Sequence, residues 1–156
     1  MCTSFLGELM TATHNFTTGT GNTFKGALFL ATSNTSSSTT LCASVTAYAT
    51  TVNTIAEVSG TNYTAGGVTI TNGTSPASTH SSTTAGVAYW TPTASFTYTN
   101  VTLTTAFDAV LIYNSSASNK AVSVHTFGSQ TVTAGTFTLT MPSNTTSTAL
   151  IRLATT

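Results

Sequence analysis

The first sixteen residues carry the helical pattern of this sequence. Between Ser4 and Phe16, apolar residues recur at intervals of three and four, at Phe5, Leu6, Leu9, Met10 and Ala12. Ser4 is placed to cap such a helix, and Glu8 lies in its first turns. The Thr/Gly-rich segment Thr17–Asn22 ends the pattern. The sequence therefore predicts a short N-terminal helix followed by a linker.

From Phe24 onward the hydrophobic period changes to two, which is the period of a β-strand. Phe24–Ala31 is apolar on both faces, as expected of a strand in the middle of a sheet. Further strands are predicted at Tyr48–Thr54, Ala56–Val58, Val68–Thr71, Gly86–Trp90, Ser95–Thr104, Phe107–Tyr113, Ala121–Phe127, Thr131–Met141 and Ala149–Ala154. Short, Thr-rich strands at this spacing predict an all-β fold, an antiparallel β-sandwich or jelly roll with a short N-terminal helix.

Four details of the sequence predict local structure. In Ser95–Thr104 the apolar residues move from even to odd positions, and a bulge or turn at Asn100 would return them to one face. Asn114–Asn119 has the residue types of a hairpin loop. Tyr63 is the aromatic residue of a turn-rich segment and is expected to anchor it. Phe107–Tyr113 is apolar at almost every position and should be buried on both faces.

The change of period divides the chain into an N-terminal helical arm and linker, 1–20, and a β-sandwich domain, 21–156. A helix this short is marginal alone in water, so its apolar side chains need a surface to pack on. We expect that surface on a sister subunit or on a capsid shell, with the protein's own sheet as the alternative. The candidate interface residues are Phe5, Leu9, Met10 and Phe16.

Composition removes several classes of function. Ser and Thr make up 60 of the 156 residues, whereas Lys, Arg, Asp and Glu together number 6 and the net charge is zero. Three basic residues cannot neutralise enough phosphates for nucleic-acid binding. No apolar run exceeds five residues, so we expect no membrane span and no signal peptide, and synthesis in a cytoplasm. Thr32–Thr40 is a Ser/Thr/Asn run, predicted to be a surface loop.

The residues able to carry chemistry are few and scattered. The candidates for acid–base or metal chemistry are Glu8, Glu57, Asp108, His14, His80 and His125, and no two lie within four residues. His125 is expected to be a hydrogen-bonded or exposed histidine of a sheet, and His80 a solvated loop residue. Cys2 and Cys42 are too few and too distant for a disulfide framework or a zinc site, so we expect two thiols. The sequence predicts no catalytic residues, no metal and no cofactor.

Ten segments together resemble small bacteriophage virion structural proteins. The most specific is Glu57–Gly67, and the others are Glu8–Met10, His14–Phe16, Phe24–Leu30, Thr46–Tyr48, Ala109–Asn114, Asn119–Val122, Phe127–Gly128, Thr133–Phe137 and Ile151–Leu153. The resemblance implies a capsid decoration, or cement, protein that binds the lattice of the major capsid protein on the outer surface of the head. Such a protein is expected to be a homo-oligomer, a trimer or a dimer.

Two other functions stay open from the sequence. A tail or fibre component, including a receptor- or glycan-binding module, would use Tyr63, Tyr89, Trp90 and Tyr98 as stacking platforms, although core packing of these aromatic residues is the simpler interpretation. A virion glycosidase would need two carboxylates within about 5–10 Å of each other. The chain has three carboxylate side chains in all, so we expect no enzyme.

Overall fold

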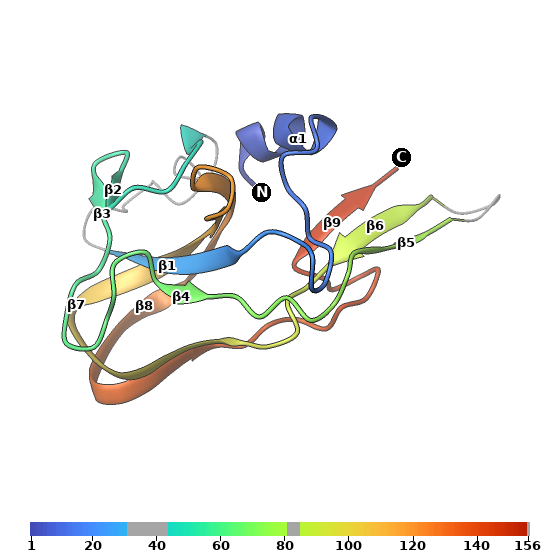
Figure 1. The fold of residues 1–156 in the computed structure, drawn as a ribbon. Coiled ribbons are helices and arrows are strands. Elements are labelled where there is room, and N and C mark those ends of the chain that lie inside the picture. The colour runs from blue at the N-terminus through green and yellow to red at the C-terminus, as the bar shows by residue number, and fades with distance from the viewer. Residues whose placement is uncertain (31–43, 81–84, 156) are drawn as a thin grey trace.

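The computed structural model describes residues 1–30, 44–80 and 85–155. It consists mostly of antiparallel β-strands with one short helix in the described part of the chain, which confirms the all-β prediction (Figure 1). The elements are α1 (Thr3–Met10), β1 (Phe24–Leu30), β2 (Thr51–Val52), β3 (Ile55–Ala56), β4 (Val68–Thr69), β5 (Ala77–Thr79), β6 (Val87–Trp90), β7 (Phe96–Asn114), β8 (Lys120–Leu139) and β9 (Ile151–Ala154). The loop predicted at Thr32–Thr40 and Cys42 lie outside the described residues.

The larger sheet has the strand order β4-β1-β7-β8, with every neighbouring pair antiparallel. β1 lies inside this sheet, and its residues from Gly26 to Phe29 are buried without interruption. The run from Ala109 to Tyr113 on β7 is buried in the same way. Both predictions of strands covered on two faces are confirmed, because a strand inside a covered sheet has no solvent side on which polar residues would be favoured.

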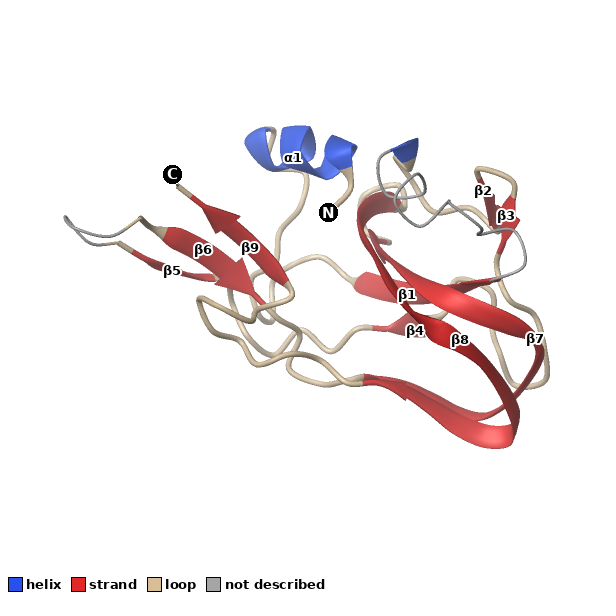
Figure 2. Ribbon diagram, turned by 180° about the vertical axis from the view of Figure 1, so that it is seen from behind, coloured by secondary structure: helices blue, strands red, loops and turns tan. Residues whose placement is uncertain are grey.

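β7 and β8 form one long, curved hairpin (Figure 2) where the sequence predicted four shorter strands. At the points where the sequence predicted the strands to end, the pairing of β7 with β8 shifts its register and then continues. The hairpin loop was predicted correctly. Asn114 Oδ1 accepts a hydrogen bond from the backbone nitrogen of Ser116, and Ser118 and Asn119 both have positive φ.

The predicted irregularity at Asn100 is also confirmed. Asn100 has a φ of 52°, and the register with β8 shifts between Tyr98 and Val101. Tyr98 and Val101 are buried while Thr99 and Asn100 are exposed. One inserted residue in a left-handed conformation therefore returns the apolar positions to the core face.

The second sheet has the strand order β5-β6-β9 and lies beside the larger sheet, with α1 over the region between them (Figures 1 and 2). The sequence predicted β6 and β9 but missed β5. All three residues of β5 are exposed, so the strand has no apolar alternation to reveal it. Backbone pairing with β6 forms it instead. The strands predicted around Tyr48–Val58 shorten to the two-residue pair β2 and β3.

The N-terminal helix is shorter than predicted and begins differently. α1 ends at Met10, and Ala12 adopts a φ of 56° that no helix can continue through. Cys2 holds the N-cap position, and Ser4 instead donates a hydrogen bond to the backbone oxygen of Val45 at 3.4 Å. The side chain of Ser4 therefore joins the helix to the rest of the fold and does not cap it.

The prediction that this segment stands apart from the core is wrong for Phe5 and Phe16. Phe5 is fully buried and Phe16 is 8% exposed, and both belong to the hydrophobic core. Phe16 stacks on Phe24 of β1 with ring centroids 4.3 Å apart, and its ring lies 4.6 Å from that of Trp90 on β6. The surface that α1 needs is the protein's own pair of sheets, which was the alternative interpretation.

Candidate functional site

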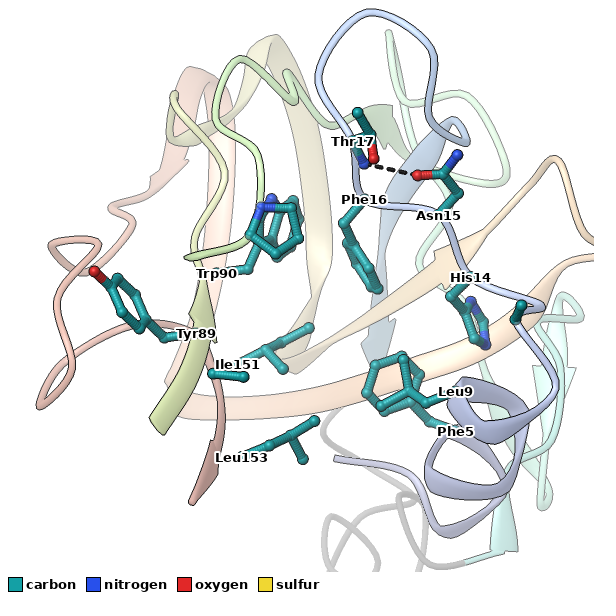
Figure 3. Close-up of a pocket in the computed structure, with 13 residues that line it drawn as sticks. Phe5, Leu9, His14, Asn15, Phe16, Thr17, Tyr89, Trp90, Ile151 and Leu153 are labelled. Carbon is teal, nitrogen blue, oxygen red and sulfur yellow. Dashed lines mark hydrogen bonds between the residues drawn. The ribbon is translucent and has the colours of Figure 1, made fainter. Parts of the chain in front are cut away.

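An apolar groove of about 450 Å³ lies between α1 and the three-stranded sheet (Figure 3). Its apolar lining comes from both ends of the chain and from β6: Phe5, Leu9, Phe16, Trp90, Ile151 and Leu153. Small-molecule and peptide side-chain sites have volumes of about 300–1,000 Å³ and similar apolar walls. The groove is thus large enough to receive a group from outside the chain.

Aromatic contacts hold the walls of the groove in place. Phe5 packs against His14 with centroids 4.9 Å apart and meets Phe16 edge to face at 6.0 Å. The indole nitrogen of Trp90 donates to Asn72 Oδ1 at 3.1 Å and to the backbone oxygen of Thr74 at 2.9 Å. A buried indole with its donor satisfied keeps a fixed orientation, so this wall is rigid.

The exposed large apolar side chains of the described residues lie on the elements that border the groove. Met10 is 87% exposed, Met1 46%, Leu6 44% and Leu153 36%. The first three belong to α1 or precede it, and Leu153 belongs to β9 and also lines the groove. Exposed apolar side chains that gather in one region are typical of an interaction surface.

An ionic network fixes α1 to the β7–β8 hairpin. Glu8 Oε1 accepts a hydrogen bond from Lys120 Nζ at 2.8 Å, and Glu8 Oε2 lies 2.7 Å from His14 Nε2. His14 Nδ1 lies 3.1 Å from the amide nitrogen of Asn114, which can only donate, so His14 Nδ1 accepts and Nε2 carries the proton given to Glu8. The four side chains are therefore all satisfied.

The pKa of Glu8 reflects these contacts. Burial raises the pKa, but the hydrogen bonds from Lys120 and His14 and the positive charge of Lys120 lower it by more, and the result lies below the ordinary value of 4.5. Glu8 is accordingly an ionised carboxylate at neutral pH, and it stabilises the docked position of α1.

A second carboxylate, that of Glu57, is buried next to β1, where Glu57 forms a β-bridge with Phe29. It is 7% exposed and accepts three hydrogen bonds from neutral donors. These come from Tyr48 Oη at 2.6 Å, Tyr63 Oη at 2.7 Å and the backbone nitrogen of Gly66 at 2.8 Å. Tyr63 Oη also accepts from the backbone nitrogen of Leu28 at 3.0 Å, which confirms that Tyr63 anchors its loop.

The tyrosines around Glu57 are held in their neutral form. Burial, together with the hydrogen bond and charge of Glu57, raises the pKa of both Tyr48 and Tyr63. Burial and the same charge raise the pKa of Tyr113 to about 12. Each hydroxyl therefore remains a donor across the physiological pH range, as the hydrogen bonds require.

His125 and His80 lie where the sequence predicted. His125 is on β8, within 3.0 Å of Ser123 Oγ, and burial together with the positive charge of the N-terminal amino group lowers its pKa to about 4. His80 is exposed and follows β5 directly. Neither histidine has a carboxylate as its hydrogen-bond partner among the described contacts.

The described residues contain no group of three or more His, Cys, Asp or Glu side chains that could hold a metal ion. Glu8 and Glu57 contact different partners on different elements, and Asp108 lies on β7. What the arrangement offers chemically is apolar contact in the groove and two satisfied polar networks.

The four predicted interface residues are brought together only in part. Phe5, Leu9 and Phe16 line the groove, but Phe5 and Phe16 form its buried floor, and Met10 stands exposed outside it. Of the four predicted stacking aromatics, Trp90 and Tyr98 are buried and Tyr63 is used by the Glu57 network, so the simpler interpretation of core packing is correct for these three. Tyr89 is half-buried at the edge of the groove.

The sequence interpretation missed the contribution of the C-terminal strand to the groove. Ile151 and Leu153 lie more than 130 residues from Phe16 in the sequence and meet it only through pairing of β9 with β6. The alternation of apolar residues in β9 was the available signal, but it does not say which surface the strand faces.

Comparison with protein-family models, curated protein sequences and solved structures gives no match. A functional assignment therefore rests on the groove, the apolar side chains around it and the two carboxylate networks. In the part of the chain that the structure describes, no helix is long and apolar enough to cross a membrane.

Proposed function

We propose that this protein is a bacteriophage virion structural protein, a capsid decoration (cement) protein that binds the lattice of the major capsid protein. It would be made in the host cytoplasm and lie on the outer surface of the head, as a dimer or trimer. Its two antiparallel sheets would belong to a β-sandwich or jelly roll of the kind such proteins use. The proposal involves no cofactor, metal, nucleic acid or membrane.

The observation that carries the proposal is the apolar surface around α1 and β9. Leu6 and Met10 stand exposed on α1 and Leu153 on β9, and these two elements border a groove with aromatic walls. The chain has few charges to make a salt-dependent contact. An uncharged apolar surface suits a permanent place in an assembly, where it is covered by a neighbouring protein. The occupant we propose for the groove is an apolar side chain of the major capsid protein.

The proposal assigns no enzymatic activity. Glu8 and Glu57 are both engaged in hydrogen bonds that hold the fold together. A screen with ester, glycoside and phosphate substrates should show no turnover. Turnover that Asp108→Asn or His125→Ala abolishes would contradict this part of the proposal.

A tail or fibre component with a receptor- or glycan-binding surface is the second candidate, and Tyr89 is the observation that favours it. Its half-buried ring points away from the groove, on the opposite side of β6 from Trp90 (Figure 3), where an aromatic face can stack on a sugar ring. Tyr89→Ala would then abolish glycan binding, whereas it should leave the occupancy of a capsid lattice nearly unchanged.

The decisive experiment is a cryo-EM reconstruction of virions that contain the protein, with its copy number per particle. Density on the head in hundreds of copies supports a cement protein, and density on the tail in a few copies to a few dozen supports the second candidate. Density in neither place would overturn both.

Particle binding by variants tests whether the apolar surface is the contact. Met10→Asp and Leu153→Asp should lower occupancy on particles strongly, since each places a charge in the interface. Thr138→Asp, at an exposed position of β8 away from the groove, is the matched control.

Retention of the wild-type protein on particles should change little between low and molar salt, because few charges take part in the contact. Release in proportion to the salt concentration would indicate a charged contact instead.

A further inference from the structure

The N-terminal segment, residues 1–16, docks on a site that later residues build entirely. This receiving site is formed by Phe24, Val45, Trp90, Asn114, Lys120 and Val122. The backbone nitrogen of Cys2 donates to the backbone oxygen of Val122 at 2.9 Å, and Glu8 pairs with Lys120. Every contact that the segment makes with this site would be equally available from a second copy of the chain.

One closed loop joins the segment to β1. The backbone nitrogen of Gly21 donates to the oxygen of Thr17 at 2.8 Å, and that of Asn22 donates to the oxygen of Asn15 at 2.7 Å. A Cβ atom on Gly21 would lie 2.6 Å from the oxygen of Asn15 and would overlap the oxygen of Thr17. The loop can therefore close tightly only because residue 21 is glycine.

We propose that this loop is a hinge through which the N-terminal segment exchanges between two copies of the chain. In the exchanged dimer, residues 1–16 of each copy occupy the receiving site of the other, with the same core and ionic contacts. Six residues, Thr17–Asn22, span about 20 Å when extended, which is enough to bridge adjacent copies. Exchange of an identical element is a low-cost route to a dimer because the exchanged form keeps nearly all native interactions.

Opening the hinge breaks the hydrogen bonds within the loop and a small number that join it to other segments. Besides the two backbone bonds, Asn15 N donates to Asn22 Oδ1, Thr17 N to Asn15 Oδ1 and Thr18 N to Ser75 Oγ, all at exposed positions, and Asn22 Oδ1 also accepts from Asn114 at a part-buried position. Water can replace such bonds at little cost. Exchange needs a second copy and no other partner, so it is independent of the proposed role in a virion.

Gly21→Ala tests the hinge directly. The added methyl group clashes in the closed loop and is free of those oxygens in the open one, so the dimer fraction at equal concentration should rise at least about tenfold over wild type. Gly7→Ala is the matched control, because a Cβ at Gly7 meets nothing within 4 Å. Size-exclusion chromatography with light scattering measures both.

Charge reversal across the Glu8–Lys120 pair tests whether the dimer is an exchanged one. Glu8→Lys and Lys120→Glu each place like charges together within one chain. When the two variants are mixed in equal amounts, only segment exchange restores opposite charges at both sites. Native mass spectrometry should therefore show the heterodimer above the one-half share of all dimers that random pairing gives. The double variant in a single chain restores the pair internally and should behave like wild type.

The two experiments decide the proposal together. A heterodimer share clearly above one half supports exchange even if Gly21→Ala aggregates. Folded Gly21→Ala that stays at the wild-type dimer fraction, or mixed variants whose heterodimer share does not exceed one half, overturns it. A Gly21→Ala dimer combined with a heterodimer share of one half would show that the copies associate by another surface, and it also overturns exchange.

Discussion

The N-terminal segment and the loop Ser59–Gly67 both lie outside the larger sheet and are both held to it by a carboxylate, but the chemistry of the two attachments differs. Glu57 receives neutral donors from residues at most nine positions away and is buried. Glu8 accepts hydrogen bonds from the ammonium group of Lys120 and the ring of His14, and Lys120 is 112 residues away with its side chain 39% exposed. The first arrangement is local and shielded from water, whereas the second is distant and open to it.

This difference indicates which of the two segments can detach from the larger sheet while the rest of the domain stays folded. The loop Ser59–Gly67 approaches β1 so closely that Gly67 and Gly26 touch through their backbones, and both ends of the loop continue into the sheet. The N-terminal segment attaches to the rest of the fold mainly through side chains, with one backbone hydrogen bond from Cys2 N to Val122 O. We therefore expect the loop to unfold only with the whole domain, and the segment to be separable from it.

The largest effect is expected for Gly67→Ala. Gly67 has a φ of 68°, and a Cβ there would overlap the backbone oxygen of Gly26. Unfolding by denaturant should show a loss of about 5 kcal/mol, enough to unfold a marginal domain. Gly128→Ala, where a Cβ meets nothing within 4 Å, should change stability by less than about 1 kcal/mol. Equal effects would show that the loop is not held against β1 as described.

Phe16→Ala should cost about 4 kcal/mol, because it removes a buried ring stacked on Phe24. Met10→Ala, from the same segment but 87% exposed, should change the free energy of unfolding by less than about 0.5 kcal/mol. Thermal and denaturant unfolding measure both. A small loss in the free energy of unfolding for Phe16→Ala would contradict this and would mean that the segment does not belong to the core.

Glu57→Ala should cost about 3 kcal/mol, because two tyrosine hydroxyls and the nitrogen of Gly66 lose their acceptor. Tyr48→Phe removes one of these donors and leaves the carboxylate with two, so about 1 kcal/mol is expected. Denaturant unfolding gives both values. If Tyr48→Phe costs as much as Glu57→Ala, the network depends on that one hydrogen bond and not on the carboxylate as a common acceptor.

Acid should destabilise the protein through His125. Its pKa is about 4 in the folded protein against 6.5 in the unfolded chain, so the unfolded state binds more protons between these values. The stability is complete above pH 6.5 and falls as the pH decreases to 4, by about 3 kcal/mol in total. His125→Gln should flatten this range, whereas His80→Gln at an exposed position should not. NMR titration of His125 also reports whether the N-terminal amino group stays close.

The smallest effect is expected at the Glu8–Lys120 pair. Lys120→Met should cost less than about 1 kcal/mol, and molar salt should reproduce part of that loss in the wild type, because the pair is open to water. The pKa of Glu8 is lowered in the fold, so its contribution is present above pH 4.5 and is lost as the pH falls further. Salt-independent stability would show that the charges contribute nothing.

Local features of the fold could be predicted from the sequence because they depend on neighbouring residues. The period of two predicted β1 and the buried run of β7, and the slip in apolar positions predicted the irregularity at Asn100. β5 was missed because its exposed residues carry no periodic signal, and the length of the β7–β8 hairpin was missed because register shifts let pairing continue where the pattern falters.

The sequence by itself determined that the chain is β-rich, nearly uncharged and provided with an amphipathic N-terminal helix. Only the tertiary structure decided what covers that helix, that Phe16 stacks on Phe24 and meets Trp90, and that His14 contacts Asn114 a hundred residues away. The physical reason is that a periodic pattern records which face of an element is apolar. Which other face it packs against depends on the path of the whole chain, and distant residues meet only after the sheets have formed.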